Sequence, residues 1–391
     1  MTRPLTSAVR AMRPGVFADL QARIDAVAAA GRDLVGLHIG DTCVAPPDVG
    51  ATWQDPVALG AYGATAALSD LRRALAERMT RLGHGPATVD PERELLVGAG
   101  ATHALSCALR AIVGEGDDVL LVAPYWPLAH GIIVGTGARA VEVPLTDRLY
   151  ADSSLDVTAV LEAARTPETR AIYIITPNNP DGKVWRRAEL AQVVDFASRH
   201  DLWLVSDEAY ADWVYGGEHV STASLPGAAA RTISAYSMSK SHAMAGARIG
   251  CVVAAPEVIS AARRVSVHTV FNVPVAMQRA ACAALAADRE FAADTRARYV
   301  AARDLAESAL AGSGLRWFSP EGGAYLFLDF SPVLAGRPLG RVMERAIDEG
   351  VLLAPGEAFG DAYASWARLC FTAVPPARLA EGIARLRRAI G

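Results

Sequence analysis

The residues best suited to chemistry stand directly after three short apolar runs of the chain. An Asn-Asn-Pro-Asp-Gly turn (178–182) follows the first run, an Asp-Glu-Ala-Tyr segment (207–210) follows the second, and Ser-Met-Ser-Lys (237–240) closes the third. A Gly-Ala-Arg-Ile-Gly segment (246–250) comes soon afterwards. Because ligands collect at the carboxyl ends of the strands in open α/β sheets, we expect these side chains to form one site.

The residue types suit an aromatic phosphate cofactor that carries a carbonyl group. Asp207 can pair with a ring nitrogen and keep it protonated, and Lys240 can form a Schiff base with the carbonyl. A phenol and an amide can both donate to a ring oxygen, and serines together with an arginine can bind a phosphate. These are the requirements of pyridoxal 5'-phosphate, whose protonated ring acts as an electron sink.

The motifs PNNPDG, VSDEAY, SMSK and GARIG, in this order, resemble those of a known enzyme family. The chain is similar to the fold-type I, pyridoxal-phosphate-dependent aminotransferases of class I/II, near the aspartate/aromatic aminotransferase branch. The resemblance extends from residues 35–40 to residues 367–371. It implies transfer of the amino group of an α-amino acid to a 2-oxo acid.

The resemblance assigns catalytic roles to Lys240, Asp207 and Tyr210, with Asn179 as a binding partner of Tyr210. Lys240 corresponds to the Schiff-base lysine, which also moves a proton at the substrate, and Asp207 to the partner of the pyridine nitrogen. Tyr210 and Asn179 correspond to the pair that hydrogen-bonds the ring oxygen and lowers the pKa of the Schiff base.

The remaining cofactor contacts implied by the resemblance surround the phosphate and the ring. The turn before a helix at 101–112 offers backbone N–H groups to an anion, and an aromatic residue stacks on the ring. One tyrosine reaches the phosphate from the other subunit, which implies a homodimer with composite sites. These residues are Ala101, Thr102, Trp126, Ser237, Ser239, Arg248 and Tyr62.

The substrate contacts implied by the resemblance centre on Arg368, which matches the arginine that grips the α-carboxylate. Gly40 allows close approach of the backbone, and His38 lies near the entrance for the substrate side chain. Trp126 and Asn179 complete the expected substrate-binding set. Asp181 stands where the family commonly has a threonine. Because this difference lies near the entrance, the resemblance does not identify the substrate.

The charge of the side chain to be bound is a separate question. In relatives that handle aspartate, one source of a second cation is a lysine at the position of Thr102. Residues on the entrance side, His38, Val44, Phe17 and Phe271, are neutral or aromatic. We therefore expect an amino donor with an uncharged, bulky side chain. Arg263 or Arg264 of a partner subunit could still supply the missing cation.

Short apolar runs alternate with amphipathic segments between residues 95 and 256, which predicts an α/β fold with a mostly parallel sheet covered on both faces. The flanks suggest a smaller α+β unit, with one long helical stretch at 274–310. We expect a large cofactor-binding domain at 45–285 and a small domain formed by 1–44 and 286–391.

Composition excludes several classes of protein. The 391 residues carry 38 Lys+Arg against 42 Asp+Glu, so no basic surface for nucleic acid or anionic lipid is expected. No run approaches the roughly 20 apolar residues of a membrane span. Five scattered cysteines without a C-x-x-C pair, and histidines without a common spacing, predict neither disulfides nor a metal site. We expect a cytoplasmic protein.

Two other functions remain open on the sequence. The same lysine chemistry supports β- or γ-elimination or cyclisation, depending on which bond is broken, so a lyase or cyclase is the main alternative. A non-catalytic regulatory domain that binds pyridoxal phosphate is the second. Regulators of that type carry a helix-turn-helix domain ahead of the fold, whereas here the small-domain pattern begins almost at the first residue.

Overall fold

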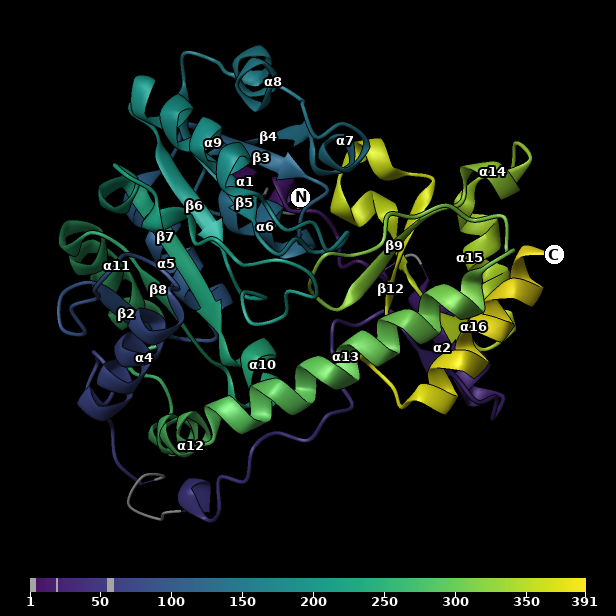
Figure 1. The fold of residues 1–391 in the computed structure, drawn as a ribbon, viewed down its shortest axis with the longest axis horizontal. Coiled ribbons are helices and arrows are strands. Elements are labelled where there is room, and N and C mark those ends of the chain that lie inside the picture. Colours follow the sequence, from purple (N-terminus) through teal and green to yellow (C-terminus); the bar gives the residue numbers. More distant parts are fainter. Residues whose placement is uncertain (1–4, 19, 55–59) are drawn as a thin grey trace.

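A seven-stranded sheet forms the centre of the larger of two lobes (Figure 1) in this computed structural model, which describes residues 5–18, 20–54 and 60–391. Its order is β2-β8-β7-β6-β5-β3-β4. The pairs β4–β3, β3–β5, β5–β6 and β6–β7 are parallel, and β8 is antiparallel to both of its neighbours. The predicted mostly parallel sheet is confirmed. The strands are β2 (Leu95–Ala99), β3 (Asp118–Ala123), β4 (Arg139–Pro144), β5 (Thr169–Ile175), β6 (Trp203–Asp207), β7 (Thr232–Ser237) and β8 (Ile249–Val253).

Both faces of this sheet are apolar, and alternate residues of each strand enter different cores. On β5, Tyr173 and Ile175 enter one core, while Ile172 and Ile174 enter the other. This follows from the two-residue period of a strand. Helices α5, α6 and α11 cover the first face, and α8 and α9, with α4 and α12 at the β2 end, cover the second.

The helices of this lobe connect strands or flank them. Most are crossovers between parallel strands, which need a dozen or more residues. They are α4 (Ser69–Leu82), α5 (Ala101–Ile112), α6 (Pro127–Val134), α7 (Thr146–Ala151), α8 (Val157–Ala164), α9 (Arg187–Arg199), α10 (Met238–Ser241), α11 (Pro256–Thr269) and α12 (Val275–Ala286). Short 3₁₀ turns lie at Thr52–Gln54, Thr222–Ser224, Ala229–Arg231 and Ala245–Ala247.

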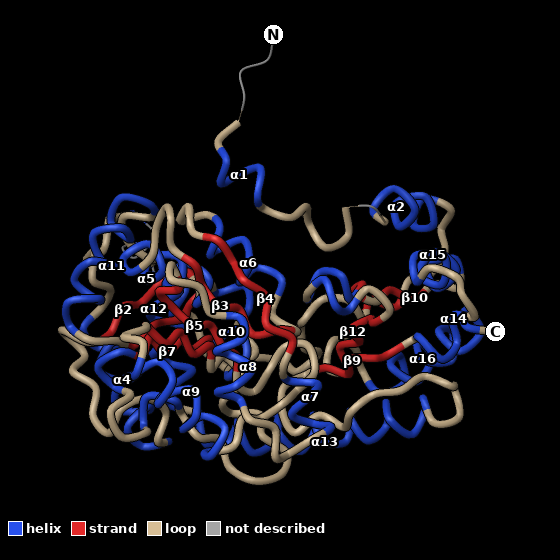
Figure 2. The backbone as a smooth tube through the Cα atoms, turned by 90° about the horizontal axis from the view of Figure 1, so that it is seen from above, coloured by secondary structure: helices blue, strands red, loops and turns tan. Residues whose placement is uncertain are grey.

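The smaller lobe lies beside the sheet (Figure 2). It contains its own apolar core. A three-stranded antiparallel sheet, β11-β12-β9, and a parallel β1–β10 pair pack against long helices. Its elements are β1 (Val35–Gly36), β9 (Tyr325–Asp329), β10 (Val351–Leu352), β11 (Ala354–Pro355), β12 (Trp366–Cys370), α2 (Gln21–Ala29), α13 (Asp288–Leu310), α14 (Ser331–Leu334), α15 (Leu339–Asp348) and α16 (Pro376–Ile390). Two 3₁₀ turns, Gly356–Phe359 and Asp361–Tyr363, follow β11, and α1 (Ser7–Ala11) lies next to α6.

The long helical stretch expected at 274–310 is divided. Helix α12 ends at Ala286 and α13 begins at Asp288, whose carboxylate accepts hydrogen bonds from Arg78 and Arg81 of α4. A carboxylate in the first turn is favourable for a helix, so Asp288 suits the start of α13. The proposed domain boundaries at 44/45 and 285/286 remain predictions, and residues 1–4 of the expected small domain lie outside the described residues.

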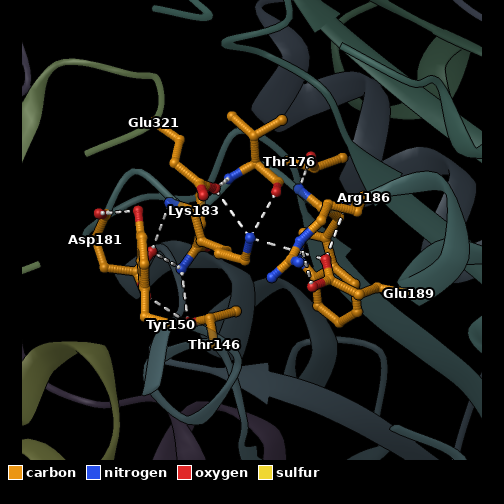
Figure 3. A network of polar contacts seen from close by, with 11 residues as sticks. Thr146, Tyr150, Thr176, Asp181, Lys183, Arg186, Glu189 and Glu321 are labelled. Atoms are coloured by element: carbon orange, nitrogen blue, oxygen red, sulfur yellow. Dashed lines mark hydrogen bonds and ion pairs between the residues drawn. The ribbon is translucent and has the colours of Figure 1, made fainter. Parts of the chain in front are cut away.

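A buried polar network joins the 178–189 segment of the larger lobe to Glu321, which precedes β9 (Figure 3). The ammonium of Lys183, whose side chain is fully buried, donates to Glu321 Oε2 and to the Val184 carbonyl, both at 2.9 Å. Glu189 lies 3.8 Å from the same ammonium. Glu321 itself is 37% exposed, so water solvates one partner of this pair and not the other.

This asymmetry predicts unequal effects of removing either partner. Glu321→Ala leaves a buried cation poorly paired and should cost about 3 kcal/mol of unfolding free energy. Lys183→Met leaves a carboxylate that water can reach, and should cost about 1 kcal/mol or less. Urea denaturation of both variants measures the difference. Asp294→Ala, which removes an exposed ion pair with Arg298, is the control and should change stability by less than about 0.5 kcal/mol. A larger loss in Lys183→Met than in Glu321→Ala would contradict the argument.

Candidate active site

One cavity lies at the carboxyl edge of the large sheet, where it meets the smaller lobe. Twelve of the residues singled out by the sequence line it, and they come from strand ends, helix starts and both lobes. They are Gly40, Ala101, Thr102, Trp126, Asn179, Asp207, Tyr210, Ser237, Ser239, Lys240, Arg248 and Arg368.

Lys240 lies on α10, a single helical turn directly after β7. Its ammonium donates to the carbonyl of Gly40, and its own carbonyl accepts from Trp213 Nε1 at 3.2 Å. The ammonium also lies 5.7 Å from the centre of the Tyr210 ring. The lysine therefore spans the cavity from the large sheet to the smaller lobe.

Asp207 ends β6 and is buried. Its Oδ1 accepts from the Ala209 N–H at 3.1 Å and its Oδ2 from the Tyr173 hydroxyl at 3.2 Å. Burial disfavours the charged form and raises the pKa of this carboxyl to about 6. The charge of Glu208 also raises the pKa, whereas the two hydrogen bonds and the charge of Lys240 lower it. A cation close to this carboxylate would therefore stabilise its ionised form.

The neighbouring Glu208 is buried on the opposite face of the sheet. Its carboxylate accepts from Ser206, Ser221 and Tyr236 hydroxyls and lies 3.0 Å from His219 Nε2. Burial alone would raise its pKa, but His219 and the hydroxyl donors outweigh burial and lower it. Glu208 therefore carries a negative charge beneath the site, a role that the sequence did not reveal.

Arg368, on β12, is 7% exposed and lies close to two aromatic rings. Its guanidinium carbon is 4.4 Å from the ring centre of Tyr325 and 4.9 Å from that of Phe359. Nη1 donates to Asn179 Oδ1 at 2.9 Å and Nη2 to the His38 carbonyl at 2.7 Å, while Nε is buried without a partner among the described residues. Within the described part of the chain, this guanidinium therefore lines the cavity with no carboxylate paired to it.

Tyr325 is a site residue that the sequence did not single out. Its hydroxyl shares a short hydrogen bond with the Tyr210 hydroxyl. A Cβ on Gly40 would lie 2.0 Å from the same oxygen, so only glycine fits beside it. The available signal was a tyrosine at the start of a largely apolar strand, a pattern that usually indicates core.

A second cationic region lies where α5 begins. Gly100, with φ +80°, precedes the helix, and a Cβ there would lie 2.4 Å from Arg248 Nη2. Arg248 Nη1 lies 3.4 Å from the Ser239 hydroxyl and donates to the Ala245 carbonyl at 3.0 Å. A helix N-terminus, a guanidinium and a hydroxyl together form a site for an anion.

The turn that contains Asn179 is held in place by the side chain of Asp181. The buried carboxylate of Asp181 accepts from Asn178 Nδ2 at 2.8 Å, from the Lys183 N–H at 3.0 Å and from the Thr146 hydroxyl. Burial raises the pKa of Asp181 to about 6. Asp181 thus supports the turn from behind instead of facing the cavity.

Two predicted site residues do not line the cavity. Tyr62 is 87% exposed and packs edge-on against Phe271, with ring centres 5.0 Å apart. The ring of His38 packs against Phe17 at 4.6 Å, and burial and the charge of Arg368 lower its pKa to about 4. Only the His38 carbonyl reaches the site, through Arg368. The roles assigned to both remain predictions.

Other kinds of site can be assessed for the described part of the chain. There, no three or more His, Cys, Asp or Glu side chains come together as a metal site would require. Across residues 5–18, 20–54 and 60–391, no helix combines the length and apolarity needed to cross a membrane.

Comparison with known proteins places this arrangement among related enzymes. The family model described as aminotransferase class I and II matches residues 32–386. The arginine–pyruvate transaminase of Pseudomonas aeruginosa is 36% identical over 302 residues, covering 76% of this chain and 75% of that protein. The aspartate/prephenate aminotransferase of Thermus thermophilus is 33% identical over 376 residues, covering 93% and 94%.

Solved structures agree with the sequence comparison. The aspartate aminotransferase of Thermus thermophilus with maleate superimposes with a TM-score of 0.89 at 31% identity, over 99% of this chain and all of that one. The N-succinyldiaminopimelate aminotransferase of Mycobacterium tuberculosis gives a TM-score of 0.89 at 28% identity, again over 99% and 100%.

Proposed function

The chain belongs to the class I and II aminotransferases and is a pyridoxal-phosphate-dependent aminotransferase. We propose roles for its site residues, a class of amino donor and an active site that two subunits of a homodimer share. One observation carries the proposal: Lys240, Asp207 and Arg368, from distant parts of the sequence, line one cavity.

The donor set of the cavity fits pyridoxal 5'-phosphate. The N-terminus of α5 with Arg248 suits the phosphate, and the buried carboxylate of Asp207 suits a protonated ring nitrogen. Tyr210 and Asn179 can donate to the ring oxygen. The sequence contains two lysines, Lys183 and Lys240, and the ammonium of Lys183 is bound in the network behind the turn. Lys240 is therefore the side chain available for the carbonyl.

When bound, the cofactor supplies a protonated ring that withdraws electrons from the substrate's α-carbon. Asp207 holds the proton on the ring nitrogen. Arg368 would bind the α-carboxylate through its guanidinium, and so fix the α-carbon near Lys240. The amine of Lys240 would then take the proton from that carbon and pass it to the cofactor carbon that carried the carbonyl group.

The lining of the cavity supports an uncharged donor. Its cations among the described residues are Lys240, Arg248 and Arg368, each of which has a role above. Thr102 adds no charge, and the lining also includes Ile39, Leu105, Trp126 and Tyr325. A bulky apolar or aromatic side chain can be buried there, whereas a side-chain carboxylate finds no cation of its own within this protomer's described residues.

A homodimer is supported by the surface around Tyr62. Tyr62, Val270 and Phe271 are 87%, 38% and 43% exposed, which is unusual for large apolar side chains that adjoin one another. A second copy that covers these rings would bury them and bring Tyr62 to the partner's phosphate site.

A cytoplasmic location belongs to the same proposal. It is supported by the five cysteines, Cys43, Cys107, Cys251, Cys282 and Cys370, which are all free. Proteins of oxidising compartments more often pair such residues.

Lys240→Ala should lose the borohydride-reducible link to the cofactor together with turnover. Lys183→Met is the matched control, because it removes the other lysine of the chain and should keep the link. Reduction followed by mass spectrometry of peptides measures both. A reducible link in Lys240→Ala that maps to Lys183 would refute the assignment.

The donor prediction is tested by kcat/KM for phenylalanine or tyrosine against aspartate. The aromatic donors should be preferred, and conversion of the bound cofactor to its amine form, with release of the matching 2-oxo acid, identifies transamination. A preference for aspartate of tenfold or more, about 1.4 kcal/mol in transition-state binding, would show that a cation from elsewhere serves the side chain.

Mixed dimers test the shared site. Tyr62→Phe should weaken cofactor binding about tenfold, since a hydrogen bond to a charged group is lost. In a heterodimer of Tyr62→Phe and Lys240→Ala subunits, the site that keeps Lys240 receives Tyr62 from the other subunit. Its cofactor affinity should therefore equal that of the unaltered enzyme. If that site instead binds the cofactor as weakly as the Tyr62→Phe homodimer does, Tyr62 acts on the site of its own subunit, and the shared site is wrong.

A further inference from the structure

Tyr173 is the one aromatic residue of β5 and lies one strand away from Asp207. In the parallel register of β5 and β6, Tyr173 pairs with Val205 and Ile175 with Asp207. Residues two apart on a strand point to the same face, so Tyr173 and Asp207 share a face. The long side chain of Tyr173 extends along the strand toward the carboxyl edge, where its hydroxyl donates to Asp207 Oδ2 at 3.2 Å.

The hydroxyl does not contribute to packing. Tyr173 is fully buried in a core that includes Ala123, Ile133 and Val205. A phenylalanine would fill nearly the same volume among such neighbours. Burying a hydroxyl costs free energy unless it is hydrogen-bonded, and the bond it makes here is to a carboxylate that lines the cavity.

The two donors on Asp207 differ in what they fix. The Ala209 N–H belongs to the same turn as Asp207 and binds Oδ1. Tyr173 comes from the neighbouring strand and binds Oδ2, so together they fix the rotation of the carboxylate plane. Without Tyr173, a single local bond would leave that plane free to turn.

The charge of Asp207 depends on the same contact. Titratable groups act on it from three elements: Tyr173 of β5, Glu208 of its own segment and Lys240 of α10. Burial and Glu208 raise the pKa of Asp207, while the hydrogen bonds from Ala209 and Tyr173 and the charge of Lys240 lower it. A donor to the carboxylate favours the ion pair with a ring nitrogen over the neutral pair in which the proton has moved to Asp207.

We propose that Tyr173 is a positioning residue of the reaction, whose hydroxyl aims the Asp207 carboxylate at the cofactor ring and keeps it ionised there. This inference rests on the role proposed above for Asp207. It adds a residue that contacts neither cofactor nor substrate and acts through the carboxylate.

The test is Tyr173→Phe in the holoenzyme loaded with pyridoxal phosphate labelled with ¹⁵N in the ring. The ¹⁵N chemical shift should move from the protonated toward the neutral pyridine value and respond to pH over a lower range than in the unaltered protein. We expect kcat to fall about tenfold, about 1.4 kcal/mol, with KM changed by less than about twofold. A structural role alone would not move the ¹⁵N signal.

Tyr363→Phe is the matched control. Tyr363 is also buried in this core and donates to a carboxylate, that of Asp147, away from the cavity lining. In the Tyr363→Phe enzyme, the ¹⁵N signal of the cofactor ring and kcat should equal those of the unaltered enzyme. If Tyr173→Phe does not fold, 3-fluorotyrosine placed at position 173 provides the second test. It is a stronger donor, so the ¹⁵N signal should move further toward the protonated value.

The variant Asp207→Asn distinguishes a failure of the role proposed for Tyr173 from a failure of the role proposed for Asp207. If the ¹⁵N signal moves in Asp207→Asn but not in Tyr173→Phe, the positioning role is wrong and the role of Asp207 stands. If the signal stays protonated in Asp207→Asn, the proposed role of Asp207 fails, and the inference from Tyr173 fails with it.

Discussion

A carboxylate has to remain charged where water is excluded, and the arrangement around Asp207 follows from that requirement. Removing a charge from water is expensive, so its counter-charges and donors must be in place before any ligand arrives. Parallel strands meet this requirement because neighbouring ends lie at the same edge, which brings the Tyr173 hydroxyl and the Lys240 ammonium to one side. The seven-stranded sheet thus brings together the groups that stabilise the buried charge of Asp207.

The smaller lobe contributes what the sheet cannot. Arg368 and the Gly40 carbonyl enter the cavity from its strands and loops, and the Lys240 ammonium reaches across to that carbonyl. The two aromatic rings that enclose the Arg368 guanidinium stabilise it through cation–π contacts and limit its movement. The position of this guanidinium therefore depends on how the lobes meet, since it also donates to Asn179 of the larger lobe.

The sequence predicted the parts of the site that follow from local pattern. Polar motifs after apolar runs predicted that Asn179, Asp207 and Lys240 would lie at one edge, and all three line the cavity. Tyr173 and Tyr325 were missed because a tyrosine inside an apolar strand is typical of core, and only the register shows where its hydroxyl points. Pattern alone also does not show that the His38 carbonyl accepts a hydrogen bond from Arg368, a contact that comes from the backbone and not from the imidazole.

The segment before β9 is one of the connections at which the lobes could bend. Its backbone is tied to the larger lobe, since Gly322 N–H donates to the Gly182 carbonyl and Gly323 N–H to the Trp213 carbonyl, and the Lys183–Glu321 ion pair adds to these bonds. A rotation of the smaller lobe would therefore hinge just after Gly323, next to Tyr325. Because displacement grows with distance from a hinge, the Tyr325 hydroxyl would hold its place beside Tyr210 while the far strands and helices of the lobe swing through a wider arc.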